Sequence, residues 1–180
     1  MTAVLLSTSQ SFAQEDGEDR TQYLINPGDL LEVSVWKELD LQRTVLIRPD
    51  GAFSFPLSGD IVAEGRTVED IREELETRLA TYIPDLVVTV TVAEIRGNKI
   101  FVIGQVKNPG EFVMNPRVDV MQALSIAGGT TPFAQLNNIR ILRRSNGVQT
   151  IREFRYNDII KGQNLSQNVL LEVGDVVLVP

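Results

Sequence analysis

The stretch from residue 23 to residue 36 reads YLINPGDLLEVSVW, and its Asn-Pro-Gly-Asp segment recurs as Asn-Pro-Gly-Glu at residues 108–111. Each copy precedes an apolar run. Pro fixes φ at the second position of a turn, and Gly adopts positive φ at the third position of a type II turn. The pattern therefore predicts two copies of one turn, Asn26-Pro27-Gly28-Asp29 and Asn108-Pro109-Gly110-Glu111, each of which begins a strand.

The alternative is that Asp29 and Glu111 form an acid/base pair. A glycosidase of this kind needs two carboxylates about 5–10 Å apart across a cleft. Because the two acids fall in separate predicted units, we expect no catalytic pair. Val in place of Gly28 or Gly110 is expected to impair folding, whereas Asp29→Asn is expected to be tolerated.

Composition removes several classes of site. The 180 residues contain no Cys and no His, which excludes Ser-His and Cys-His triads, disulfides and zinc sites of the usual ligand types. We predict no catalytic, metal-binding or cofactor-binding residues and no enzymatic activity.

Charge is unevenly distributed along the chain. Residues 1–92 carry 17 acidic and 7 basic side chains, whereas residues 93–180 carry 7 acidic and 10 basic ones. A nucleic-acid surface requires concentrated basic charge, so this distribution does not favour nucleic acid as a partner. Arg140, Arg143 and Arg144 do cluster, and we expect them on the solvent face of a strand end.

Residues 1–21 contain a short apolar patch, then Ser11-Phe12-Ala13 and an acidic stretch. The small-x-small pattern is typical of a signal-peptidase site, but the basic and long apolar regions of a full signal are missing. We interpret the segment as a signal-peptide remnant, cleaved near Gln14, followed by an acidic disordered tail; the alternative is an ordinary disordered N-terminus.

A first unit is predicted over residues 22–95, with a mixture of strands and one helix. Alternating apolar residues at 31, 33 and 35 predict a strand, and Asp50-Gly51 and Gly59-Asp60 predict turns. Thr67 and Asp70 form the pattern of a capping box, and Pro84 ends the helical periodicity. The predicted apolar face of that helix comprises Ile71, Leu75, Leu79 and Tyr82.

A second unit is predicted over residues 96–180, with a β-grasp-like order of strand pair, helix, hairpin and final strand. Asp119 is a candidate cap for its helix, and Gly128-Gly129 predicts the helix end rather than a phosphate-binding loop, because such loops precede a helix. Asn146-Gly147 predicts a hairpin. Gly174-Asp175, within EVGD at residues 172–175, predicts the turn before the last strand. The predicted fold class is α+β.

Aromatic residues are candidates for sugar contact, although isolated aromatics in strands pack more often in cores or between subunits. Trp36 and Tyr82 are retained as candidate glycan contacts, with Phe53 and Phe55 as alternatives. The acids Asp50, Asp60 and Asp175 all adjoin Gly and lack the spacing of a calcium loop, so we assign them to turns.

The ordered segments resemble the outer-membrane polysaccharide export family. Residues 23–36, the segment VLIRPDGAFSFPLSGDIVAEGRT and VVTVTV resemble its export domain; VIGQVKNPGEF, ALSIAGGTT and LEVGDVVLVP resemble its SLBB domain, a soluble-ligand-binding β-grasp module. No single segment is specific, but their order and spacing are.

The resemblance implies a periplasmic, outer-membrane-associated component that exports capsular, exopolysaccharide or O-antigen-type chains. Members commonly form homo-oligomeric rings and contact an inner-membrane copolymerase or chain-length protein. Because the sequence shows one SLBB unit and stops at Pro180, we expect a short form without the C-terminal membrane helix, served by a separate outer-membrane β-barrel. The alternative function is a periplasmic module that binds a glycan or soluble ligand without forming a conduit.

Overall fold

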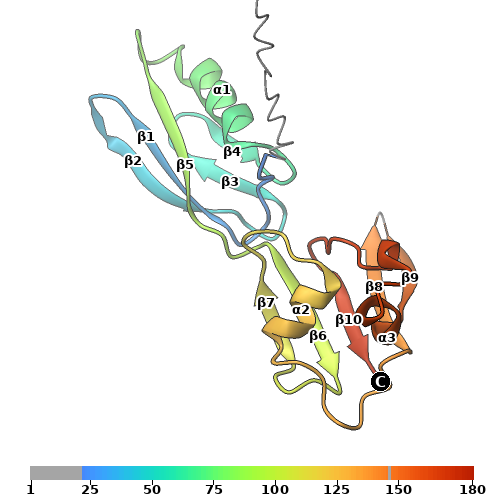
Figure 1. Ribbon diagram of the computed structural model, residues 1–180. Coiled ribbons are helices and arrows are strands. Elements are labelled where there is room, and N and C mark those ends of the chain that lie inside the picture. Colours follow the sequence, from blue (N-terminus) through green and yellow to red (C-terminus); the bar gives the residue numbers. More distant parts are fainter. Residues whose placement is uncertain (1–21, 146) are drawn as a thin grey trace, which may run out of the picture.

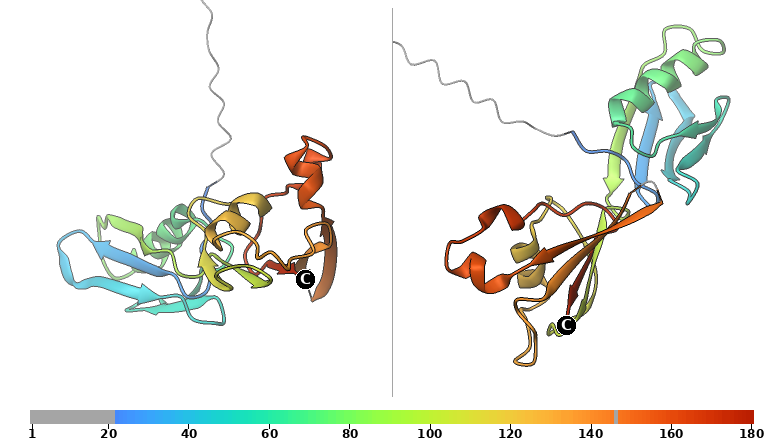
Figure 2. Two further views of the ribbon diagram at one scale, coloured as in Figure 1. Left: turned by 60° about the horizontal axis from the view of Figure 1, so that its bottom comes forward. Right: turned by 90° about the vertical axis from the view of Figure 1, so that its right-hand side faces the viewer.

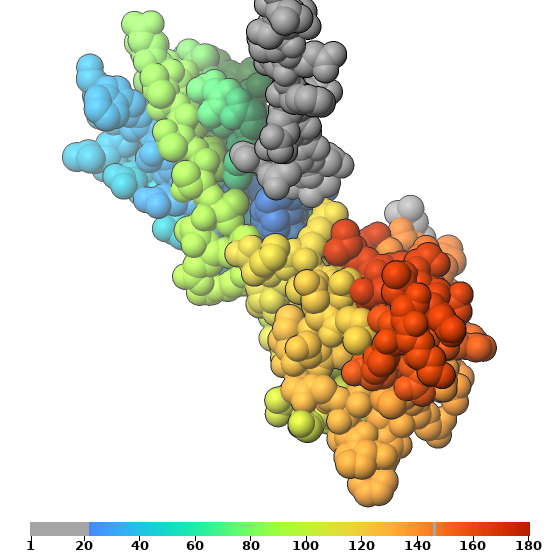
Figure 3. Space-filling view, viewed as in Figure 1, coloured from blue at the N-terminus to red at the C-terminus, as the bar shows by residue number. Residues whose placement is uncertain are grey.

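The computed structural model describes residues 22–145 and 147–180, which form two lobes with separate hydrophobic cores (Figures 1 and 3). The chain crosses from the first lobe to the second between β5 and β6, and the lobes meet at a narrow junction seen from two further sides in Figure 2. The predicted signal-peptide remnant and Asn146 lie outside the described residues.

The first lobe contains a three-stranded antiparallel sheet, a two-stranded hairpin and one helix (Figure 1). The sheet has the order β2-β1-β5, and β3 pairs with β4. The elements are β1 (Leu30–Val35), β2 (Glu38–Leu46), β3 (Ala52–Phe55), β4 (Gly59–Val62), α1 (Val68–Leu79) and β5 (Val88–Glu94). Phe53 and Phe55 are buried in the core of this lobe.

Helix α1 begins and packs as its sequence predicts. Thr67 and Asp70 form both hydrogen bonds of a capping box, which satisfies backbone N–H groups that the first turn leaves unpaired. Ile71, Leu75 and Leu79 are buried against the sheet. Tyr82 does not continue this apolar face: the helix ends at Leu79, and Tyr82 is 61% exposed in the following turn.

The second lobe is built on a five-stranded sheet with the order β7-β6-β10-β8-β9. Strand β10 lies in the centre, parallel to β6 and antiparallel to β8. The elements are β6 (Lys99–Gly104), β7 (Gly110–Val113), α2 (Val120–Ile126), β8 (Ile139–Ser145), β9 (Val148–Phe154), α3 (Tyr156–Ile160), a 3-10 turn (Leu165–Gln167) and β10 (Val176–Val179).

Helix α2 has the predicted signals at both ends. Asp119 and Gln122 form a capping box, and Gly128 and Gly129 adopt φ of 79° and 82° where the chain leaves the helix. Leu124 is buried in the core of the second lobe. The two lobes together have an α+β fold, as predicted.

The prediction of a turn at residues 108–111 is wrong. Gly110 is the first residue of β7 and does not adopt positive φ, and the Glu111 N–H donates no turn hydrogen bond to Asn108 among the described residues. Asn108 instead donates its backbone N–H to Ala127 O at 2.9 Å. The chain therefore bends at Asn108 beside the end of α2 and enters β7 at Gly110, which does not need the positive φ that the sequence pattern predicted.

Among the residues that the structure describes, no helix combines the length and apolar character needed to cross a membrane.

The outermost strand β9 offers a test of the second core. Phe154 is fully buried, whereas Ile151 on the same strand is 60% exposed. We expect Phe154→Ala to lower the free energy of unfolding by about 3–5 kcal/mol through loss of buried surface and cavity formation, with Ile151→Ala changing it by less than about 1 kcal/mol. Amide hydrogen exchange in β6, β8 and β10 measures both effects; equal loss of protection in the two variants contradicts the assignment.

Candidate functional site

The carboxylate of Asp29 lies at the junction between the lobes and is completely buried. Its Oδ2 accepts hydrogen bonds from the Tyr23 hydroxyl at 2.5 Å and the Asn26 backbone N–H at 2.9 Å. Its Oδ1 accepts from the backbone N–H groups of Arg96 at 2.9 Å and Gly97 at 2.8 Å. Four donors thus satisfy one carboxylate without a cationic side chain.

The turn at residues 26–29, which we call the Asp29 turn, directs this carboxylate inward. Gly28 has φ of 95°, and the Asp29 N–H donates to Asn26 O at 3.1 Å. The turn is also bonded to the end of β2, because Gly28 N donates to Ile47 O at 2.8 Å and Ile47 N donates to Asp29 O at 2.9 Å. A side chain at position 28 would need a backbone conformation that only Gly adopts at low cost.

The Asp29 carboxylate connects the first lobe to the linker that enters the second. Arg96 and Gly97 lie between β5 and β6, the only place where the described chain crosses between lobes. Gly97 packs so closely that a Cβ atom there would overlap Pro27 O and the Asn26 side chain. The junction is therefore held both by hydrogen bonds and by direct backbone packing.

A second turn of the same construction occurs at residues 172–175, the Asp175 turn. Asp175 is fully buried, its Oδ2 accepts from Glu172 N at 2.8 Å, and its own N–H donates to Glu172 O at 3.0 Å. Gly174 has φ of 82° and donates its N–H to Lys99 O, as Gly28 does to Ile47 O. The structural counterpart of Asn-Pro-Gly-Asp is thus Glu-Val-Gly-Asp, and not Asn-Pro-Gly-Glu.

The two buried carboxylates differ in the kind of donor that they bind, because Asp175 has a cationic partner and Asp29 does not. Asp175 accepts from Arg143 Nε at 2.9 Å and Nη2 at 2.7 Å, and this contact raises the pKa of Arg143. The Arg143 side chain is only 18% exposed, so its expected position on a solvent face is wrong. Desolvation by burial, reinforced by the hydrogen bond to Asp29, raises the pKa of Tyr23 well above its usual range.

Glu111 does not join Asp29. It lies on β7, where its exposed carboxylate accepts from Lys99 Nζ at 2.9 Å. An exposed pair of this kind contributes about 0–1 kcal/mol to stability. Within the described residues, no group of three or more acidic side chains is arranged to hold a metal ion.

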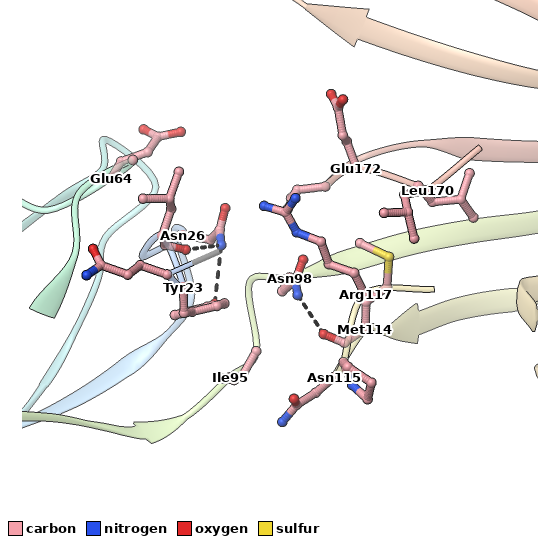
Figure 4. Close-up of a pocket in the computed structure, with 16 residues that line it drawn as sticks. Tyr23, Asn26, Glu64, Ile95, Asn98, Met114, Asn115, Arg117, Leu170 and Glu172 are labelled. Atoms are coloured by element: carbon pink, nitrogen blue, oxygen red, sulfur yellow. Dashed lines mark hydrogen bonds between the residues drawn. The ribbon is translucent and has the colours of Figure 1, made fainter. Parts of the chain in front are cut away.

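A groove of about 890 Å³ opens beside the Asp29 turn, and we call it the interdomain groove (Figure 4). Tyr23, Asn26 and Glu64 line it from the first lobe, and Asn98, Met114 and Arg117 line it from the second. Its volume falls within the range of about 300–1,000 Å³ that small-molecule sites occupy. Sequence reasoning missed this groove, because its walls come from segments that are distant along the chain.

The remaining predicted turn residues lie away from the groove. Gly51 has φ of 77° after Asp50, and Gly59 has φ of 70° where Gly59 and Asp60 begin β4. Arg48 bonds both Asp50 and Asp60, and it lowers the pKa of each carboxyl.

The β1–β2 turn and the α1–β5 connection, which carry the candidate sugar-contact aromatics, lie at the end of the first lobe away from the junction (Figure 1). Trp36 is 70% exposed between β1 and β2, and Tyr82 is exposed between α1 and β5. The groove contains a different aromatic, Tyr23.

Two family models match this chain in the order of the lobes. Residues 17–93 match the polysaccharide biosynthesis/export protein model, and residues 98–179 match the SLBB domain model. The chain thus contains a polysaccharide export domain followed by an SLBB domain. The Asp29 turn and α1 fall in the first match, and the Asp175 turn falls in the second.

Curated proteins named for polysaccharide export or production are similar to most of this chain. It is 28% identical to the EPS I polysaccharide export outer membrane protein EpsA of Ralstonia solanacearum over 88% of this chain and 48% of that protein. It is 26% identical to the exopolysaccharide production protein ExoF of Rhizobium meliloti (86% and 35%) and 24% identical to the capsule polysaccharide export protein BexD of Haemophilus influenzae (92% and 45%). The chain spans about half or less of the length of these relatives.

Two of these relatives are named as polysaccharide export proteins, one of them as an outer membrane protein, and the third is named for exopolysaccharide production.

The burial of Asp29 changes the expectation for its substitution. In Asp29→Asn one oxygen becomes an NH₂ group that faces two donors, so we expect the free energy of unfolding to fall by about 2–4 kcal/mol. The matched control is Glu111→Gln, the same change in the other Asn-Pro-Gly-acid segment, which should alter it by less than about 0.5 kcal/mol. Urea unfolding followed by circular dichroism compares them; equal effects contradict the contrast in burial.

Two glycines with ordinary φ test the packing of the junction. Gly97→Ala introduces a Cβ that overlaps Pro27 O, whereas a Cβ at Gly110 meets no atom within 4 Å. We expect Gly97→Ala to destabilise the protein by about 1–3 kcal/mol and to change the relation of the lobes, and Gly110→Ala to be neutral or slightly stabilising. Thermal unfolding and small-angle scattering measure the two effects; unchanged scattering and stability in Gly97→Ala would show that the junction yields without cost.

Proposed function

We propose that this chain is a non-catalytic, periplasmic component of a machine that exports capsular, exopolysaccharide or O-antigen-type chains, and that copies of it form or extend a ring-like conduit at the outer membrane. The observation that carries the proposal is the pair of family matches, in order, on two lobes joined through a buried carboxylate. A repeated subunit of a conduit needs such a junction, because the relation of its lobes must be the same in every copy.

Unpaired sheet edges support self-association. Strands β2 and β9 each lie at an edge and pair on one side only within the described chain. Leu39 on β2 is 85% exposed, and Val148 and Ile151 on β9 are 64% and 60% exposed. An edge with free backbone groups and exposed apolar side chains is a surface for pairing with another chain, and we assign it to a second copy.

The environment of the acids supports a non-catalytic role. Asp29 and Asp175 are fully buried and bonded to donors of the chain itself, so neither presents a carboxylate to a substrate. A general acid or base has to reach the reacting group within hydrogen-bond distance.

The partners follow from the export role. We propose an inner-membrane copolymerase or chain-length protein on one side, a separate outer-membrane β-barrel on the other, and polysaccharide in transit between them. We propose that the segment before residue 22 directs the export of the protein itself to the periplasm.

The alternative is a periplasmic module that binds a glycan or another soluble ligand without forming a conduit. The interdomain groove favours it, because a site of this volume with polar walls can bind a ligand in a single copy.

Deletion of the coding region from its host tests the export role. We expect surface polysaccharide to be lost while the lipid-linked repeat units are still made, and a wild-type copy to restore it. Immunoblots or glycan analysis of the cell surface and of membrane lipids measure the two pools. Unchanged surface polysaccharide contradicts the proposal.

Mass measurement separates the conduit from the isolated module. Light scattering on the purified chain should give a closed oligomer, and Ile151→Lys on the β9 edge should reduce its mass. A monomer at all concentrations, unaffected by that substitution, favours the binding module.

A further inference from the structure

The interdomain groove is built from side chains that present hydrogen-bonding groups in fixed orientations. Asn98 is only 8% exposed, and its Nδ2 donates to Met114 O at 2.5 Å. Its Oδ1 has no hydrogen-bond partner among the described residues and faces the groove (Figure 4). Because the amide nitrogen is hydrogen-bonded to the protein, the amide oxygen is held in a fixed orientation, in which it can accept a hydrogen bond from a ligand.

Asn26 repeats this arrangement on the opposite wall. Its Nδ2 donates to Leu24 O at 2.8 Å and to the Tyr23 hydroxyl at 3.2 Å, which leaves Oδ1 without a partner among the described residues. The Tyr23 hydroxyl is in turn fixed by Asp29. The same network that holds the lobes together therefore orients one wall of the groove.

Arg117 supplies hydrogen-bond donors to the same groove. It belongs to the second lobe, and Figure 4 shows its guanidinium directed across the groove toward the side that carries Asn26. No ion pair with Arg117 occurs within residues 22–145 and 147–180. Asn115 adds a further exposed amide beside it, and Leu170 adds apolar surface.

The charges of the lining decide between classes of ligand. Glu64 and Glu172 lie at the groove together with Arg117, the one cation among the described lining residues, and Glu172 is already paired with Arg143. A ligand with its own carboxylates would meet Glu64 as well as Arg117, so the lining gives it no net attraction. Hydroxyl groups, which both donate and accept, match the amide oxygens and the guanidinium.

We propose that the interdomain groove is a weak binding site for a short, uncharged stretch of glycan, with Asn26, Asn98 and Arg117 as the polar contacts and Tyr23 and Leu170 as the apolar ones. The choice of ligand class rests on the proposed export role. The site contacts one or two sugar units of a passing chain, and its affinity is low, with a dissociation constant on the order of millimolar, because only a few contacts form on an open surface.

The test is a titration of the isotope-labelled full chain with two oligosaccharides of equal length. Cellotetraose is the uncharged probe, and tetragalacturonate is the charged one. We expect chemical-shift changes at Tyr23, Asn26, Asn98, Asn115 and Arg117 with cellotetraose, and at least several-fold weaker binding of tetragalacturonate. Arg117→Ala should weaken cellotetraose binding about tenfold, and Asn115→Ala about threefold.

Arg140→Ala is the matched control, because Arg140 is exposed on β8 in the same lobe and outside the groove. It should leave the binding unchanged. The proposal is overturned if shifts are absent or scattered over both lobes, if tetragalacturonate binds more tightly, or if the Arg140 and Arg117 variants lose affinity equally. The titration needs no export machinery, so the two proposals fail separately. Absence of glycan binding would overturn the groove proposal without affecting the deletion result. A deletion that leaves surface polysaccharide unchanged would overturn the export role without affecting the binding measured here.

Discussion

The structure depends on one buried carboxylate that bonds backbone atoms from both sides of a lobe boundary. Asp29 belongs to a turn of the first lobe, yet two of its four donors are N–H groups of the linker, Arg96 and Gly97. A charge without a cationic partner is costly to bury, and four converging donors offset that cost here. The arrangement explains why two small lobes with separate cores keep a defined relation at a narrow contact.

The same turn also orients the polar groups on the surface beside it. The hydroxyl of Tyr23 and the amide of Asn26 are oriented by the Asp29 turn, and both face the interdomain groove. Junction and groove therefore share residues, and any movement of the lobes changes the spacing between Asn26 on one wall and Asn98 on the other. The shape of the groove is therefore coupled to the angle between the lobes.

Sequence reasoning predicted local structure well and long-range pairing poorly. The capping boxes of α1 and α2, the glycine end of α2 and the α+β class all follow from short-range chemistry, and the structure contains them. The resemblance between residues 26–29 and 108–111 was misleading, because identical letters at three positions do not fix φ at Gly110 when the neighbouring chain pairs as a strand. The true counterpart, residues 172–175, shares only Gly and Asp with the first turn. The partners of Asp29 and Asp175 lie 67 and 32 residues away, at Arg96 and Arg143, a separation that no local pattern reports.

The position of β10 has a consequence for how the protein is made. This strand consists of residues 176–179, yet it lies in the middle of the five-stranded sheet, between β6 and β8. During synthesis, the flanking strands emerge first and have no partner between them until these four residues follow. The sheet of the second lobe is thus complete only after residues 176–179 have been added, whereas the first lobe can close earlier. A chain truncated before residue 176 would have a complete first lobe and a second lobe in which β6 and β8 each lack a neighbouring strand.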